Sequence, residues 1–158
     1  MIREDEKIVI GADHGGYQLK NSLVDYLLRL GYEVVDVGAY NDEPSDYPDF
    51  ARMVAEKIQS GEARRGILIC GSGVGASIAA NKFRGIRAAV CHDTYSAHQG
   101  VEDDDMNVLC LGARIIGEAL AKDIVKAYIS AEFKNKDRYN RRLKKIEEIE
   151  NGSGQTHP

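Results

Sequence analysis

The sequence contains little cysteine, no tryptophan and no long hydrophobic run. Its three cysteines, Cys70, Cys91 and Cys110, are odd in number, lie far apart and never form a C-x-x-C pair. This pattern predicts neither a disulfide framework nor a zinc site, and it indicates a reducing compartment. Because no apolar segment approaches the ~20 residues that a membrane span needs, no membrane partner is expected.

The first six residues, MIREDE, lack the apolar stretch of a signal peptide, so we expect the protein in the cytoplasm. An excess of one charge is also absent, since 21 Lys and Arg face 25 Asp and Glu, giving a formal net charge of −4 at pH 7. Nucleic acid is therefore not expected as a partner, because its binding relies on a basic surface that displaces counterions. A small molecule is the expected ligand.

We find no internal repeat, linker or low-complexity block. A chain of 158 residues that is 43% hydrophobic fits one domain with a real core, and it excludes a two-domain enzyme. We place this single domain at residues 1–150. The last residues, 151–158, include no apolar side chain and are predicted to form a disordered tail.

Short apolar runs rich in β-branched residues alternate with longer segments of helical period. The runs lie at 7–10, 33–37, 66–70, 87–91 and 107–111. Strands that are apolar on both faces, such as the ILIC segment at 67–70, are typical of a parallel sheet that helices cover on both sides. We therefore predict an α/β fold, a three-layer αβα sandwich around a five-stranded parallel sheet.

Helical segments are expected between the runs. One should be stopped by Gly31, one should lie between Pro48 and Gly61, and others should cover 76–82 and roughly 117–130. A last helix, at 137–150, is charged at most positions and carries only a thin apolar stripe of Leu143, Ile146 and Ile149. Such a helix is expected to lie on the surface or on a partner subunit.

Ligands of open parallel sheets bind beyond the carboxyl ends of the strands, so the turns after the runs are where chemistry is expected. After the first run, Asp13 offers an acceptor and His14 a titratable donor among three glycines and an alanine. The alternative is that Asp13 merely caps the following helix and His14 is exposed. The residues alone leave both interpretations open.

Three glycines at alternate positions follow the third run, at 71, 73 and 75. Their amide groups can face an anion, which predicts an oxyanion or phosphate cradle rather than a nucleotide motif. Cys70, immediately before this glycine loop, sits where a thiolate would be stabilised, although a core role stays open. Cys91 and Cys110, inside apolar runs, are simpler to interpret as core residues.

Two further clusters carry charge. His92, Asp93 and His98 precede the acidic stretch 102–105, which suggests a metal, but the spacing matches no ligand pattern and an exposed acidic turn is the alternative. Arg114 follows the fifth run, and Arg138 and Arg142 share a helix face and suit phosphate. A solvated basic helix is the alternative for these last two.

Together these blocks closely resemble the ribose-5-phosphate isomerase B and galactose-6-phosphate isomerase family. The resemblance covers about residues 7–150. It rests on GADHGG at 11–16, DYP at 46–48, GILICGSGVG at 66–75, SIAANK at 77–82, GIRA at 85–88, NVL at 107–109 and RYNRR at 138–142. It implies a Rossmann-like fold, a sugar-phosphate substrate, aldose–ketose isomerisation without metal or other cofactor, and a homodimer or tetramer whose active sites are shared between subunits.

The resemblance also implies roles for individual residues. Cys70 matches the base that moves a proton between C1 and C2, and Ser72 matches a hydroxyl that assists the proton shift between oxygens. Asp13 and His14 match contacts to sugar and phosphate. The residues that would hold the enediolate oxygen are Gly71, Ser72, Gly73, Val74 and Gly75. The phosphate-binding arginines, which resemble groups supplied by the neighbouring subunit, are Arg114, Arg138 and Arg142.

One pair departs from the family pattern. The family commonly has a His-Asn pair whose histidine opens the sugar ring. In this chain the corresponding residues are Asp103, at the catalytic position, and Asp104, at the substrate-binding position. Aspartate carboxyls ordinarily have a pKa near 3.9, so they are ionised near neutral pH and cannot donate a proton. His98 could replace the histidine only if the helix breaks at Gly100. We therefore expect poor ring opening, and a binding module with weak turnover is the alternative function.

Overall fold

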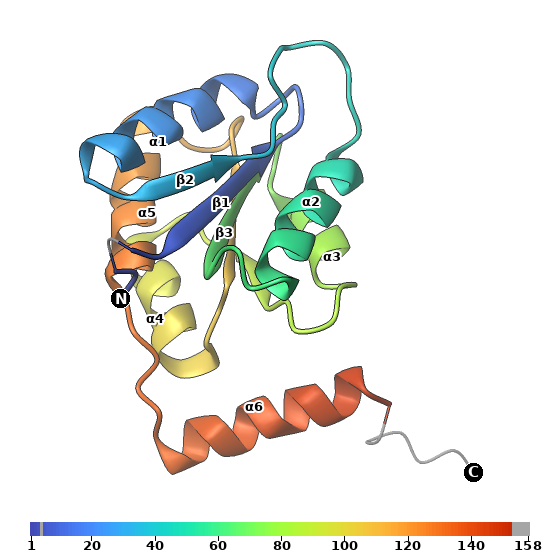
Figure 1. Cartoon of the computed structure of the whole chain (residues 1–158), viewed down its shortest axis with the longest axis vertical. Coiled ribbons are helices and arrows are strands. Elements are labelled where there is room, and N and C mark those ends of the chain that lie inside the picture. Colours follow the sequence, from blue (N-terminus) through green and yellow to red (C-terminus); the bar gives the residue numbers. More distant parts are fainter. Residues whose placement is uncertain (4, 153–158) are drawn as a thin grey trace.

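The five apolar runs form one parallel sheet in the computed structural model, which describes residues 1–3 and 5–152 (Figure 1). The strands are β1 (Lys7–Ala12), β2 (Glu33–Asp36), β3 (Arg65–Cys70), β4 (Ala88–Val90) and β5 (Val108–Gly112). Their order in the sheet is β2-β1-β3-β5-β4, and every neighbouring pair is parallel. The predicted five-stranded parallel sheet is confirmed.

Helices cover both faces of this sheet. They are α1 (Tyr17–Arg29), α2 (Tyr47–Gln59), α3 (Val74–Ala80), α4 (Thr94–Asp104) and α5 (Glu118–Ser130), and a further helix, α6 (Asp137–Glu150), follows them in the chain. The buried side chains form two clusters, one joining the sheet to α1, α4 and α5, and the other joining it to α2 and α3. The αβα sandwich predicted from the sequence is therefore confirmed (Figure 1).

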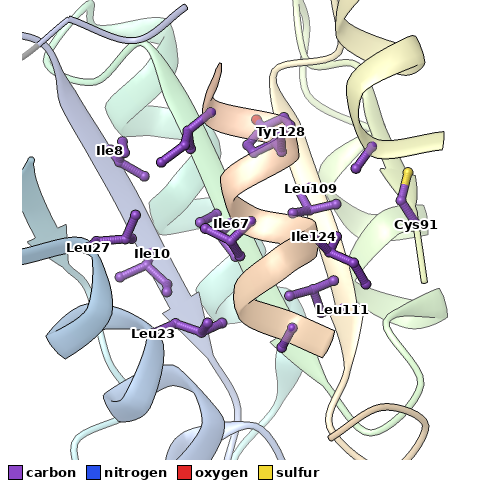
Figure 2. Close-up of a cluster of buried hydrophobic side chains, with 14 of the residues drawn as sticks. Ile8, Ile10, Leu23, Leu27, Ile67, Cys91, Leu109, Leu111, Ile124 and Tyr128 are labelled. Carbon is purple, nitrogen blue, oxygen red and sulfur yellow. The ribbon is translucent and has the colours of Figure 1, made fainter. Parts of the chain in front are cut away.

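Alternate residues of each strand enter opposite clusters. Figure 2 shows Ile10, Ile67 and Leu109 of the sheet packed against Leu23 of α1 and Ile124 of α5, all of them fully buried. Burying each such side chain contributes roughly 1.5–3 kcal/mol to the hydrophobic stabilisation. The same alternation turns Cys70 to the opposite face of the sheet, toward α2 and α3.

Two local expectations need correction. Helix α3 begins at Val74 rather than at residue 76, because Gly73 adopts a left-handed φ of 81° and the chain turns into the helix directly after it. The acidic stretch at 102–105 is not a turn. Its first three residues form the end of α4, which runs unbroken through Gly100 and stops at Asp105, whose φ is 50°.

Helix α6 lies apart from the sandwich (Figure 1). It contacts α4, and Tyr139 is its one buried residue. Near its end, a carboxylate of Glu150 accepts the Gly85 amide at 3.1 Å. Ile146 and Ile149 stay 46% and 65% exposed, so the predicted surface helix is confirmed, whereas a partner subunit on it stays a prediction. Of the predicted tail, residues 151–152 form a turn and 153–158 lie outside the described residues.

In the described part of the chain, residues 1–3 and 5–152, no helix is long and apolar enough to cross a membrane.

Candidate active site

A cavity of about 330 Å³ opens at the carboxyl edge of the sheet, where the chain order reverses between β1 and β3. Such a switch point is the usual ligand site of an open parallel sheet. The Asp13 amide donates to the Ile69 carbonyl at 3.3 Å, which ties the turn after β1 to β3. The cavity is lined by Asp13, Tyr47, Cys70, Gly71, Ser72, Gly75, Arg114 and Ile115.

Cys70 is the last residue of β3, and its side chain faces this cavity although the residue is only 4% exposed. The Gly73 amide donates to its Sγ at 3.2 Å. The other two cysteines differ, because burial raises the pKa of the Cys91 thiol to about 11 and raises the pKa of Cys110 as well. All three thiols are free, and Cys70 is the one placed for chemistry.

The glycine loop, residues 71–75, is held from two sides. The Arg114 amide donates to the Gly71 carbonyl at 3.0 Å, and the Val74 amide donates to Ser72 Oγ at 3.3 Å. A Cβ added at Gly75 would lie 2.6 Å from Cζ of Tyr47. Only glycine there lets the Tyr47 ring lie against the loop, so the loop and the start of α2 form one wall of the cavity.

The turn after β1 combines both interpretations offered for Asp13. Its Oδ1 accepts the Gly16 amide at 3.1 Å, which stabilises the turn before α1, and the same residue lines the cavity while only 8% exposed. His14 is exposed and outside the cavity lining. Its Nδ1 accepts the Ser45 amide at 3.1 Å, so a neutral ring carries its hydrogen on Nε2.

Tyr47 and Ile115 are cavity residues that the sequence did not reveal as such. The available signals were indirect. Tyr47 belongs to the DYP block, and Pro48 marks the start of a helix, which fixes Tyr47 as the first residue of α2. Ile115 directly follows Arg114 beyond the carboxyl end of β5, and this position was its signal in the sequence.

Four predicted site residues lie elsewhere. Asp103 and Asp104 end α4, and α4 precedes β5, so they belong to the amino edge of the sheet, whereas Cys70 belongs to its carboxyl edge. The five residues of β5 span about 16 Å at ~3.3 Å per residue. Within one chain, therefore, these carboxylates and the cysteine face different ends of the sandwich.

Arg138 and Arg142 lie on α6, beside the end of α4. Burial and the neighbouring charge of Asp103 raise the pKa of Asp104, while the charge of Arg142 acts in the opposite direction. Arg138 Nη2 donates to the Tyr139 hydroxyl at 3.0 Å. We call this group of Asp103, Asp104, Arg138 and Arg142 the helix half, and the cavity around Cys70 the cysteine half.

The side chains around Asp103 are arranged in two rows along α4. Gln99 Nε2 donates to Asp103 Oδ2 at 2.9 Å. His98 Nδ1 lies 2.9 Å from Glu102 Oε1, and Lys134 Nζ lies 3.0 Å from the other oxygen of Glu102. His98 is thus paired with Glu102 on an unbroken helix, and the hypothesis that it replaces the missing histidine beside Asp103 is wrong.

A second cavity, of about 650 Å³, lies next to the helix half. Its walls come from α6, α4 and the segment around β4, and include Lys82, Arg84, Arg87, Asp104, Ile146 and Ile149. It is larger than the cavity at Cys70, but it contains none of the residues of the glycine loop. The thin apolar stripe of α6 therefore borders open space in the single chain.

The suggested metal cluster does not assemble in the part of the chain that the structure describes, where no three His, Cys, Asp or Glu side chains could hold a metal ion. His92 is engaged differently, since its Nε2 accepts the Gly112 amide at 2.9 Å. Asp93 accepts the Ser96 amide and caps α4.

Comparison with known proteins adds three findings. The model of a family described as Ribose/Galactose Isomerase matches residues 8–146. Ribose-5-phosphate isomerase B of Escherichia coli K12 is 47% identical over 145 residues, 92% of this chain and 97% of that protein. D-erythrulose-4-phosphate isomerase of Pectobacterium atrosepticum is 48% identical over 130 residues, 80% of this chain and 84% of that protein.

The fold has an equally similar solved counterpart. The structure of ribose-5-phosphate isomerase B from Clostridium thermocellum aligns with a TM-score of 0.91 and 52% sequence identity. The alignment covers 93% of this chain and 99% of that one.

Proposed function

The chain belongs to the Ribose/Galactose Isomerase family, and on this premise we propose that it interconverts the aldose and ketose forms of a sugar phosphate, with Cys70 as the base. The observation that carries the proposal is the placement of Cys70. Its sulfur faces a cavity at the switch point of the sheet and accepts an amide hydrogen from Gly73.

The reaction starts from the open-chain aldose. The Cys70 thiolate removes the proton from C2, the electron pair of the C–H bond forms C1=C2, and the carbonyl electrons move onto O1. The resulting enediolate is held by the amides of the glycine loop. The thiol then returns the proton to C1, O2 loses its proton and C2=O forms. Ser72, whose hydroxyl lines the same cavity, assists the transfer between O2 and O1.

The remaining residues hold the substrate. Asp13 and His14 contact the sugar or its phosphate from the turn after β1. Arg114, exposed at the cavity, neutralises phosphate charge with a planar guanidinium that matches phosphate oxygens. No cofactor is required, because every proton in this scheme is carried by a side chain or by the substrate.

The complete site is shared between two copies of the chain. A strand length of ~16 Å separates the two halves within one chain, which is too far for one small sugar phosphate to touch both. A homodimer, or a tetramer of such dimers, would bring the helix half of one copy over the cysteine half of another. The exposed Ile146 and Ile149 of α6 support this arrangement, because a partner would cover them. We place the enzyme in the cytoplasm.

Deuterium exchange tests the proposal against the alternative of a sugar-phosphate-binding module. Incubated in D₂O with D-ribulose 5-phosphate, an isomerase that uses a single base incorporates deuterium at the carbon that receives the proton. Nuclear magnetic resonance of the recovered aldose should show this label. A chain that binds the sugar but leaves C1 and C2 unlabelled is a binding module, and the proposed function is then wrong.

A further inference from the structure

The segment that joins β2 to α2, residues 37–46, lies beside the turn that follows β1, at the carboxyl edge of the sheet (Figure 1). Backbone hydrogen bonds connect the two. The Ala12 amide donates to the Gly38 carbonyl at 2.7 Å, and the Ala39 amide donates to the Ala12 carbonyl at 2.6 Å. Because Ala12 is the last residue of β1, this pairing fixes where the turn with Asp13 begins.

A buried ion pair holds the beginning of this segment. Lys20 of α1 has a side chain only 1% exposed, and its Nζ lies 2.8 and 2.7 Å from the two carboxylate oxygens of Asp36, the last residue of β2. Asp36 Oδ1 also accepts the Gly38 amide at 2.9 Å, and the Tyr40 hydroxyl donates to the Asp36 carbonyl at 2.8 Å. Separating the pair would leave an unpaired charge inside the fold, so the beginning of the segment is held in one position.

The far end of the same segment holds His14. The Ser45 amide donates to His14 Nδ1 at 3.1 Å, and Ser45 Oγ accepts the His14 amide at 3.0 Å. Ser45 thus binds both the ring and the backbone of a residue 31 positions away in the sequence. His14 directly follows Asp13, a residue of the cavity lining, which brings its backbone to the rim of the cavity. The exposed ring is therefore held in one orientation at this rim.

That orientation determines which group the ring offers to a ligand. Because the Nδ1 lone pair is used by the Ser45 amide, the hydrogen of a neutral ring sits on Nε2, which makes Nε2 a donor. Phosphate oxygens are acceptors, so a donor is what such a ligand needs. A ring that is ordered before the ligand arrives also avoids part of the entropy cost of binding.

We propose, resting on the isomerase function above, that Ser45 is a positioning residue that fixes His14 as a preoriented Nε2–H donor to an oxygen of the bound sugar phosphate. His14 in this role binds the substrate and does not remove a proton from it, because its free ring nitrogen already bears one. Losing the Ser45 hydroxyl should raise KM about three- to tenfold, the range expected when one more side chain must be ordered on binding, and leave kcat within about threefold.

Nuclear magnetic resonance of the full-length protein, labelled with nitrogen-15, tests the geometry without any turnover. At about pH 8, where an ordinary imidazole is neutral, the His14 hydrogen should be on Nε2. A coupling across the hydrogen bond should join the nitrogen nuclei of the Ser45 amide and His14 Nδ1. The ring signals are assigned by their absence in His14→Asn. Hydrogen on Nδ1, or no coupling between these two nuclei, overturns the proposal.

Steady-state kinetics with D-ribulose 5-phosphate test the role in binding. Ser45→Ala removes the acceptor of the His14 amide and should raise KM, whereas Ser45→Thr keeps the hydroxyl and should retain the parental KM. Ser60→Ala is the matched control. The Ser60 hydroxyl also bonds the backbone, donating to the Lys57 carbonyl at 3.1 Å, but it lies at the end of α2 that leads toward the amino edge of the sheet. Its loss should leave KM unchanged.

A double variant shows whether Ser45 acts through His14. His14→Asn alone should raise KM, and Ser45→Ala added to it should raise KM no further, because the side chain to be positioned is already gone. If Ser45→Ala raises KM by the same factor in both backgrounds, the proposal is overturned, since Ser45 would then support the loop and not the ring of His14.

The outcomes separate this inference from the function on which it rests. A parent that does not turn over D-ribulose 5-phosphate contradicts the isomerase function. The Kd of ribitol 5-phosphate, which has no carbonyl and cannot react, then replaces KM in the same set of variants. An unchanged KM or Kd in Ser45→Ala overturns the positioning role alone. A rise in the parent background that disappears in the His14→Asn background supports it.

Discussion

The two halves of the proposed site are built in different ways. The cysteine half is made by strand ends and tight turns, with Asp13 8% and Cys70 4% exposed, and its shape is set by backbone hydrogen bonds. The helix half consists of side chains on the exposed faces of α4 and α6. Changing a residue in the first half disturbs the sheet edge, whereas the second can exchange side chains with little cost to the fold. In the proposed function, the proton transfer at Cys70 belongs to the rigid half.

The largest effect is expected when the cysteine half loses its base. Cys70→Ala should lower the single-turnover rate of isomerisation at least about a hundredfold, or ~2.7 kcal/mol of barrier, because it removes the proposed base. Binding of ribitol 5-phosphate, which cannot react, should change little, since the glycine loop and Arg114 remain. Stopped-flow rates and calorimetric titration measure the two quantities.

Cys91→Ala is the matched control, because it removes a thiol that is equally buried but faces the other side of the fold, near Met106. It should lower stability and leave the rate per folded enzyme within about threefold. A Cys70→Ala rate within about tenfold of the parent would remove Cys70 from the role of base.

An intermediate effect on activity is expected when one chain carries a substitution in the cysteine half and its partner carries one in the helix half. Cys70→Ala and Arg138→Ala chains should each be nearly inactive alone. After denaturation and refolding of an equal mixture, half of the dimers carry one chain of each kind, and each of these has one intact site. The mixture should therefore regain about a quarter of the parental activity, as simple pairing statistics require.

A mixture of Cys70→Ala with Cys70→Ser chains provides the control, since both defects lie in the same half and no intact site can form. Equal activity of the two mixtures would show that the halves do not meet across a subunit boundary. Light scattering of the parent should give a dimer or larger species, and a fully active monomer at micromolar concentration would contradict the shared site.

The smallest effect is expected from a single charge in the helix half. Because the pKa of Asp104 is raised in the folded chain, folding favours its protonated form. Its contribution to stability is present below the unfolded pKa and is lost as the pH rises through the folded value. Asp104→Asn should thus raise the free energy of unfolding near pH 7, by no more than about 0.5 kcal/mol at this exposed position, and the gain should shrink toward pH 4.

Urea unfolding at the two pH values measures this difference. Asp25→Asn is the comparison, since Asp25 forms an exposed ion pair with Arg29 at 2.8 Å, and its loss should leave stability unchanged or slightly lower. An equal gain in the free energy of unfolding in both variants would show that the effect comes from net charge and not from the surroundings of Asp104.

The sequence predicted most of the cysteine half because that half follows from local order. The carboxyl ends of parallel strands meet at one edge of the sheet, so residues at or shortly after the end of a run, such as Asp13, Cys70 or Arg114, had to reach that edge. The position of Tyr47 in the cavity could not be predicted in this way, because Tyr47 begins a helix and does not follow a strand. Its ring reaches the cavity only because Gly75 leaves room for it.

The acidic stretch shows where local patterns fail. Residues 102–105 are all charged, and this composition favoured a turn. In the structure, Asp93 caps a helix that buries Ala97 and Val101, and the first three of these carboxylates form its last turn. Tertiary packing of two small apolar residues outweighed the composition of the last turn.

The amino-acid sequence by itself determined the sheet, its covering helices and the glycine loop after Cys70, because hydrophobic period, glycine and strand order act over a few residues at a time. Only the tertiary structure decided that Asp103, Asp104, Arg138 and Arg142 lie at the opposite edge from Cys70, and that His98 turns to Glu102. These distances depend on how far a strand carries the chain and on which face of α4 meets the core, which no local pattern encodes.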